Sequence, residues 1–227
     1  GNDVRYELRL TFEEAAKGCH KSVEFYRYEN CATCGGSGAK PGTQPQTCSM
    51  CKGTGQIRQS GGWMTTVRTC PACGGSGKVI KDKCSSCGGS GRVRMRRTLE
   101  LDVPAGVDDN IVLSKRGQGE PGANGGPNGD LLIQIPVKPH KLFRREGTNL
   151  RLEVPISFTQ AALGAEIDVP TLDGSVKYTI PEGTQTDTEF RIRGKGIQQL
   201  GSNNKGDLIF KVRVETPRRL TEKPVSY

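Results

Sequence analysis

The sequence CATCGGSG (residues 31–38) is the first of four copies of one motif, C-x-x-C-x-G-x-G. The other copies are CSMCKGTG (48–55), CPACGGSG (70–77) and CSSCGGSG (84–91). A C-x-x-C pair places two thiolates on one tight turn, and tetrahedral zinc takes four ligands, so two such turns close one site. The glycines permit left-handed backbone angles and let amide N–H groups point back at the sulfurs. The stretch therefore predicts a module that binds two zinc ions through eight cysteines.

The composition limits the kind of protein to which this module belongs. The chain has 227 residues, of which 33% are hydrophobic and 31 are glycine, so we expect one large domain or two ordinary ones with small cores. No apolar run approaches the roughly 18 residues of a membrane span, and no signal peptide is recognisable at the N-terminus. Eight of the nine cysteines lie in metal-type pairs. We therefore expect a reducing, cytoplasmic location.

The net charge of +9 is concentrated in the cysteine-rich stretch. Residues 31–97 contain eleven Lys or Arg and one acid, Asp82, whereas the rest of the chain is close to neutral. Two zinc ions, each held by four thiolates, would lower this local charge of +10 to about +6. The charge alone is thus a weak argument for nucleic-acid binding.

The sequence outside the cysteine-rich stretch is duplicated. Alternating apolar residues predict strands at 4–10, 23–25, 99–103, 130–135 and 150–158, and Thr11 to Gly18 reads as a short capped helical turn. Residues 4–18 match 150–164 at an offset of 146, but residues 104–130 match 181–207 at an offset of 77. The difference places a 69-residue insertion at 28–96, between the counterparts of Asp173 and Gly174. The second copy has a tight turn there, so the zinc module replaces the tip of a hairpin.

This position constrains how the four cysteine pairs combine. An insertion at a hairpin tip must begin and end close together, which a nested scheme achieves directly. One zinc near the base would be held by Cys31, Cys34, Cys84 and Cys87, and the other by Cys48, Cys51, Cys70 and Cys73. An interleaved scheme requires crossing connections and is the least favoured; pairing in chain order stays open. The segment 56–68 between the inner pairs predicts a small hairpin that turns at Gly61 and Gly62.

We find no sign of an enzyme. The all-cysteine sites are closed, which argues against catalytic zinc. GQGEPG (117–122) matches a dinucleotide-binding pattern formally, but Pro121 opposes the helix that such a site needs. His20 and His140 are expected to be surface or packing residues, and Cys19 a small core residue. The zinc ions either only hold the module together or also present a binding surface, and Trp63 and Met64 are expected to pack over the distal cysteines rather than meet a partner.

The apolar residues on the short strands suggest a binding role. They form the cores of thin β domains by default, but together they can leave an apolar groove beside a strand edge. An extended peptide could add there as a further strand. Two alternatives remain: a nucleic-acid-binding zinc module, and a thiol–disulfide isomerase that acts when zinc is lost.

The four motifs, followed by VPAGVDD (103–109), GQGEPG (117–122), GDLL (129–132), FRREGTNL (143–150) and RGKGI (193–197), closely resemble the DnaJ co-chaperones of the zinc-containing type. The resemblance extends to about Thr221. It implies a mainly β fold of two duplicated sandwich-like domains, the first carrying the zinc module. The expected boundaries are 1–27 with 97–138, 28–96, 139–221, and a tail at 222–227.

The resemblance also implies a function. Such proteins capture non-native polypeptides and deliver them to a DnaK-type ATP-driven chaperone without catalysing a reaction. The family pairs the cysteine motifs in the nested way and ties the distal zinc site to cooperation with DnaK. Its client groove would fall on Val4, Val23, Phe25, Leu99, Leu101 and Ile133. The J-domain and the dimerising helix of the family have no counterpart here, so we expect a monomeric or weakly associating chain that does not stimulate the partner's ATPase.

Overall fold

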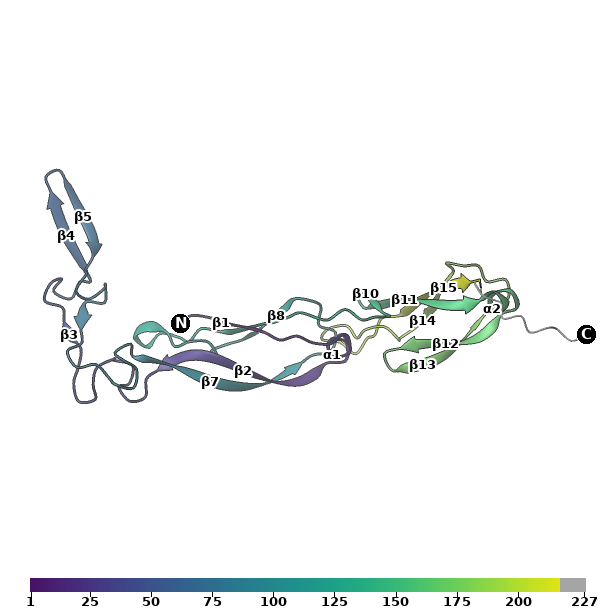
Figure 1. The fold of residues 1–227 in the computed structure, drawn as a ribbon, viewed down its shortest axis with the longest axis horizontal. Coiled ribbons are helices and arrows are strands. Elements are labelled where there is room, and N and C mark those ends of the chain that lie inside the picture. Colours follow the sequence, from purple (N-terminus) through teal and green to yellow (C-terminus); the bar gives the residue numbers. More distant parts are fainter. Residues whose placement is uncertain (217–227) are drawn as a thin grey trace, which may run out of the picture. The chain divides into compact units, whose positions relative to one another are not determined.

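The computed structural model describes residues 1–216, so the predicted end of the second β domain at 221 and the tail at 222–227 lie outside the described residues. The fold is mainly β, with 46% of residues in strands and 7% in helices. No helix among the described residues is long and apolar enough to cross a membrane. The elements, labelled in Figure 1, are β1 (Val4–Glu7), α1 (Phe12–Lys17), β2 (Cys19–Asn30), β3 (Gln46–Thr47), β4 (Gln56–Gly61), β5 (Met64–Thr69), β6 (Lys78–Val79), β7 (Arg92–Val103), β8 (Ile111–Lys115), η1 (Ala123–Gly125), β9 (Leu131–Ile135), β10 (Arg144–Glu146), β11 (Asn149–Ser157), α2 (Phe158–Leu163), β12 (Ala165–Thr171), β13 (Gly174–Ile180), β14 (Glu189–Ile192) and β15 (Leu208–Glu215).

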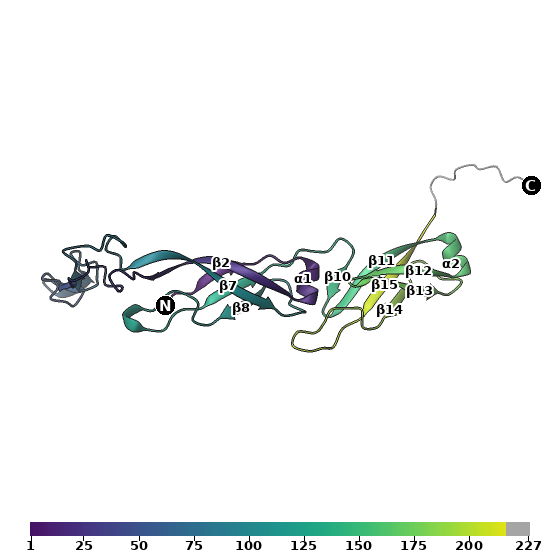
Figure 2. The same ribbon diagram turned by 90° about the horizontal axis from the view of Figure 1, so that it is seen from below.

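The strands form small sheets. The first copy of the duplicated plan contains a three-stranded sheet in the order β1-β9-β8 and a separate two-stranded sheet of β2 and β7. The second copy contains a four-stranded sheet in the order β10-β11-β15-β14 and a two-stranded sheet of β12 and β13. In that copy β11 and β15 run parallel, and α2 packs beside both of them (Figure 2).

The chain divides into two compact units. Among the described residues, one contains residues 1–6, 24–98 and 114–132, and the other contains residues 7–23, 99–113 and 133–216. The division falls within β2 and β7, so it does not coincide with the boundaries expected from the sequence. The division of the chain at residues 28, 97 and 139 therefore stays a prediction.

The structure confirms the duplicated plan element by element. In both copies a capping box starts the helix: Thr11 accepts a hydrogen bond from the N–H of Glu14, and Ser157 accepts one from the N–H of Gln160. In both copies a left-handed glycine ends it, with φ of 79° at Gly18 and 75° at Gly164. The short polar side chain at the N-cap satisfies an N–H that the first helical turn leaves free, which is why two such short helices form at matching places.

The loops after these hairpins repeat as well. The Asp130 carboxylate accepts a hydrogen bond from the Gly117 N–H at 3.0 Å, and Asp207 accepts one from the Gly194 N–H at 3.1 Å. The two copies differ at the hairpin tip. The two-residue turn between β12 and β13 has the cysteine-rich module as its counterpart between β2 and β7. Strands β2 and β7 have 12 residues each, against 7 each in β12 and β13, so the ladder continues into the inserted segment.

The largest described core lies in the second copy. Leu150, Val169, Leu208, Phe210 and Val212 are completely buried there. The Phe210 ring lies 5.1 Å from the Tyr178 ring and 5.3 Å from the Phe190 ring, measured between centroids. Such burial of aromatic and branched side chains stabilises a thin sandwich without help from metal.

Candidate metal centres

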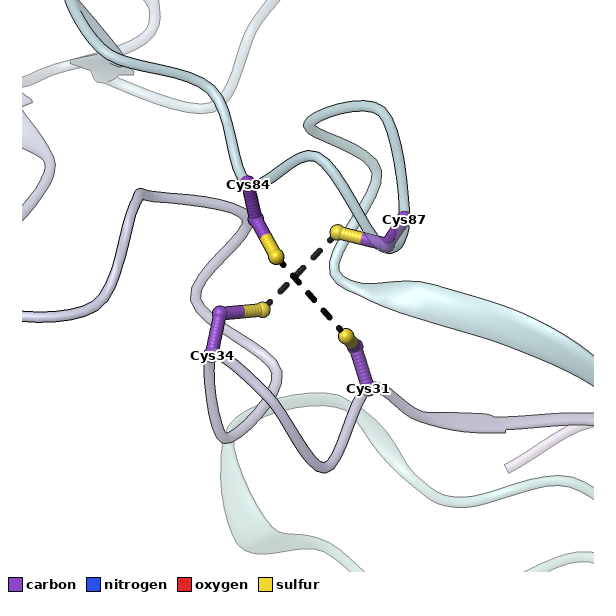
Figure 3. A group of neighbouring side chains, drawn as sticks. All are labelled: Cys31, Cys34, Cys84 and Cys87. Atoms are coloured by element: carbon purple, nitrogen blue, oxygen red, sulfur yellow. Dashed lines mark hydrogen bonds between the residues drawn. The ribbon is translucent and has the colours of Figure 1, made fainter.

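The sulfurs of the first and fourth cysteine motifs converge near the ends of β2 and β7. Cys31 and Cys34 lie on one turn and Cys84 and Cys87 on another, and all four sulfurs point toward a common centre (Figure 3). The Cys31 and Cys84 sulfurs are 3.9 Å apart, and those of Cys34 and Cys87 are 3.8 Å apart. We call this group the base cluster.

The second and third motifs form an equivalent group, which we call the distal cluster: Cys48, Cys51, Cys70 and Cys73. The Cys48 and Cys70 sulfurs are 3.9 Å apart, and those of Cys51 and Cys73 are 3.6 Å apart. Ile57 and Val79 pack against these cysteines, so the distal part has a small apolar core of its own. The structure thus groups the motifs in the nested order.

The donor sets fit zinc. A zinc–sulfur bond of about 2.3 Å in a tetrahedron requires sulfur atoms about 3.8 Å apart. The four sulfur–sulfur distances between paired motifs, from 3.6 to 3.9 Å, agree with that requirement. They are also far longer than a disulfide bond of about 2.05 Å. Two four-cysteine clusters are therefore consistent with two zinc ions, each in a closed site without an open position for a substrate.

Backbone hydrogen bonds join the paired motifs reciprocally. The Cys31 N–H donates to the Gly91 carbonyl at 2.8 Å, and the Cys84 N–H donates to the Gly38 carbonyl at 3.0 Å. The distal cluster repeats this: Cys48 donates to Gly77 at 2.9 Å, and Cys70 donates to Gly55 at 3.0 Å. Each motif therefore supplies two ligands and also fixes the start of its partner.

The amide groups after each pair point at the sulfurs, as the sequence predicts. The N–H groups of Gly38, Gly55 and Gly77 donate to the sulfurs of Cys34, Cys51 and Cys73 at 3.3 Å. The Gly91 N–H donates to the Cys87 sulfur at 3.2 Å. Such bonds favour the thiolate, the form that binds metal.

The effect on the thiol pKa follows from this arrangement. Burial acts to raise the pKa of Cys34, but hydrogen bonds from the N–H groups of Gly38 and Gly36 and from the neighbouring cysteines together lower that pKa to about 6. The pKa of Cys51 behaves in the same way. Burial acts to raise it, but hydrogen bonds that include those from the N–H groups of Gly55 and Gly53 lower it to about 6. For Cys70 and Cys84 burial prevails and raises the pKa. The backbone N–H groups also lower the pKa of Cys73 and Cys87 against the opposing effect of burial, so two thiols in each cluster favour the thiolate form.

The final glycine of each motif has a role that the sequence analysis did not anticipate. A Cβ atom at Gly38 would lie 2.4 Å from the Gly89 carbonyl oxygen, and one at Gly91 would lie 2.4 Å from that of Gly36. The distal cluster shows the same contact between Gly55 and Gly75. These glycines are needed because two motifs pass each other closely, and the invariance of the last glycine over four copies was the available signal.

The residues expected to line a client groove lie at different depths. Val23, Phe25, Leu101 and Ile133 are buried, whereas Val4 and Leu99 are half-buried. They belong to β1, β2, β7 and β9. Of these six residues, only Val4 and Leu99 therefore present accessible apolar surface.

The remaining residues discussed above are also accounted for. His20 is exposed between Asp102 and Glu100, at 2.6 and 2.5 Å. The His140 ring packs on Phe143 at 4.7 Å between centroids. Cys19 is partly buried. The expectation that Trp63 and Met64 pack over the distal cysteines is wrong, because both side chains are exposed. The inner hairpin turns at Gly62 and Trp63, one residue later than expected.

Comparisons with known proteins identify the family. The model of the DnaJ C-terminal domain matches residues 4–217. Over 98% of its length the chain is 53% identical to the chaperone protein DnaJ of Ruminiclostridium cellulolyticum, 53% to that of Acetivibrio thermocellus and 54% to that of Geobacillus kaustophilus. It spans about 60% of the length of these curated relatives. With its duplicated β plan and two four-cysteine clusters, the chain belongs to the DnaJ C-terminal domain family.

Proposed function

We propose that this chain binds non-native polypeptides as extended strands and presents them to a DnaK-type ATP-driven chaperone, without catalytic turnover. The observation that carries the proposal is the match of residues 4–217 to the DnaJ C-terminal domain, together with the cysteine-rich module inside the first copy. The closed all-cysteine sites support a structural rather than a catalytic use of zinc. The bacterial relatives and the metal-type cysteine pairs support a cytoplasmic setting.

The proposed client site is the groove of the first copy. Strand β1 is the edge of the sheet β1-β9-β8, and β2 and β7 form a sheet of only two strands, so the described residues leave strand edges open to an added strand. Backbone hydrogen bonds to such an edge supply affinity that is independent of sequence, and apolar side chains beside it select apolar clients. Of the proposed groove residues, Val4 and Leu99 are half-buried, and Val23, Phe25, Leu101 and Ile133 are buried.

The distal cluster of Cys48, Cys51, Cys70 and Cys73 is the proposed element of cooperation with the DnaK-type partner. Its support is the resemblance to the family and the separation of this cluster from the base cluster by the flanking segments 39–47 and 74–83. In this proposal the base cluster of Cys31, Cys34, Cys84 and Cys87 only closes the insertion onto β2 and β7.

The groove is tested by the double change Val4→Ser and Leu99→Ser. Both positions are half-buried, so the zinc-loaded chain is expected to stay folded while a fluorescein-labelled Leu-rich peptide binds at least tenfold more weakly by anisotropy. The matched control is Val176→Ser, the counterpart of Leu99 in the second copy, which is also half-buried. Unchanged affinity in the double variant, or an equal loss in the control, would refute the groove assignment.

Two further experiments test the alternative functions. A nucleic-acid-binding module requires affinity for single-stranded RNA that falls steeply with salt. A thiol–disulfide isomerase requires the chain to reactivate a scrambled disulfide protein, and to lose that activity on zinc loading. Either result without peptide binding would replace the proposed function.

A further inference from the structure

The hairpin of β4 and β5 carries an apolar surface for which the module itself has no use. Trp63 is 103% exposed, Met64 is 71% exposed and Val67 is 53% exposed. The two strands form a two-stranded sheet, and Figure 1 shows the hairpin projecting from the module, with β3 as the nearest labelled element. Among the apolar residues of this hairpin, only Ile57, near its base, packs against the distal cysteines. The three exposed side chains therefore contribute nothing to the small core of the module.

The turn does not explain Trp63 either. The register pairs Gly61 with Met64, which leaves Gly62 and Trp63 as the two turn residues. Gly62 has a φ of 63°, and glycine at the first central position is what a type II′ turn requires. The second central position carries no such demand, and small polar residues serve there equally well. A fully exposed tryptophan leaves a large apolar area in water, so its presence calls for a partner.

The charge around this surface is of one sign. Residues 48–79 contain four cations, Lys52, Arg58, Arg68 and Lys78, and no carboxylate. Even after a zinc ion with four thiolates contributes about −2, this part keeps an excess of positive charge. On the hairpin, Arg58 pairs with Val67 across the strands, and Arg68 lies on the same face of β5 as Met64. Each face of the hairpin thus carries one arginine and one exposed apolar side chain, which are cross-strand neighbours only in the case of Arg58 and Val67.

We propose that the free edge of β5 is a docking site for an extended acidic segment of a partner protein, with Trp63 as its anchor. The segment adds as a third strand whose carboxylates all lie on the face of Arg68 and whose apolar residues lie on the opposite face, where they cover Val67. Arg58 adds positive charge on that second face. Positive charge and an open edge select an acidic strand over a basic one. Exposed aromatic residues of this kind dominate binding energies when a partner covers them. This site is separate from the client groove and does not depend on it.

The experiment uses the zinc-loaded chain and its single tryptophan as the reporter. The probe is a capped ten-residue peptide of alternating aspartate and valine, and the matched probe alternates lysine and valine. We expect the acidic peptide to shift the Trp63 emission to shorter wavelength, saturably and more weakly at high salt, and the basic peptide to leave it unchanged. No emission change with the acidic peptide at millimolar concentration, or an equal change with both peptides, overturns the proposal.

Variants then locate the site. A labelled acidic peptide followed by anisotropy should bind Trp63→Ala at least tenfold more weakly, and the double variant Arg58→Gln and Arg68→Gln should bind more weakly with a flatter salt dependence. The matched control is Phe158→Ala, because Phe158 is a 66% exposed aromatic residue on α2. A zinc content of two per chain confirms that each variant is folded, and the emission of the unmodified chain decides the question should Trp63→Ala lose metal. An equal loss in Phe158→Ala overturns the proposal. So does tighter binding of an oligonucleotide, or a concentration-dependent dimer that Trp63→Ala abolishes.

Discussion

The substitution Gly38→Ala tests how the base cluster is built. Gly38 has a φ of 76°, and a Cβ atom there would lie 2.4 Å from the Gly89 carbonyl oxygen. Real Cβ contacts are longer than 3.0 Å, so the carbonyl must move by at least 0.6 Å. Gly89 belongs to the motif of Cys87, and its N–H helps to lower the pKa of that thiol, against the opposing effect of burial. The clash is therefore transmitted to a ligand in the partner motif.

Gly35→Ala is the matched control. Gly35 lies in the same motif with a φ of 65°, but a Cβ atom there would meet nothing within 4 Å. Both variants pay the cost of a left-handed angle, which is about 1–2 kcal/mol for a residue other than glycine. The second motif shows that this position accepts a side chain, because its counterpart is Lys52 with a φ of 55°. The difference between the two variants thus isolates the close approach of the two motifs.

We expect Gly38→Ala to weaken zinc binding at the base cluster by 10–100-fold, the usual effect of disturbing groups that orient metal ligands. This corresponds to about 1.4–2.7 kcal/mol. Gly35→Ala should weaken zinc binding less, because it costs only the backbone strain that both variants share and that Lys52 already tolerates. Competition with a chromophoric chelator measures both affinities, and cobalt substitution reports whether the sulfur tetrahedron is intact. Equal affinities in the two variants would refute the reasoning.

Four further predictions follow from the same structure. A strong chelator should expose residues 31–91 to protease while the second copy stays resistant, because only the module lacks a core that is independent of metal. Hydrogen bonds to Asp102 and Glu100 raise the pKa of His20. The stabilising effect of His20 is therefore complete below about pH 6.5 and is lost as the pH rises through the raised pKa. His20→Gln should lower the free energy of unfolding in urea more at pH 6 than at pH 9. Phe210→Ala should lower the free energy of unfolding in urea by about 3–5 kcal/mol, because the Phe210 side chain is completely buried. Thr11→Ala, which removes one half of a capping box, should lower it by about 1 kcal/mol.

Each of these has a result that would count against it. Resistance of residues 31–91 in chelator would mean that the module holds together without metal. If His20→Gln lowered the free energy of unfolding equally at pH 6 and pH 9, the ion pairs of His20 would not form in solution. A loss below about 1 kcal/mol for Phe210→Ala would place that ring outside the core. An unchanged free energy of unfolding in Thr11→Ala would show that the Thr11 cap does not stabilise α1.

Much of the fold could be predicted because the decisive signals are local or periodic. The capping box at Thr11 and the alternation in residues 99–103 depend on neighbours within a few positions. Helix α1 appears where its signal places it, and the predicted strand forms the last part of β7, which begins earlier at Arg92. The duplication is a comparison of the chain with itself, and it located the insertion between β2 and β7 without any knowledge of contacts. The cysteine spacing likewise indicated two four-sulfur sites, since metal chemistry limits what a C-x-x-C pair can do.

The sequence by itself therefore determined the repeated β plan, the place of the insertion and the chemistry of its cysteines. Only the tertiary structure decided which sulfurs meet, because that depends on how segments far apart in the chain pass each other, down to the contact between Gly38 and the Gly89 carbonyl. It also decided burial: alternation shows which residues share a face of a strand but not whether another layer covers that face. For that reason only the structure shows that Phe25 and Ile133 are buried, and that Trp63 is exposed where the sequence suggested that it packs over the distal cysteines.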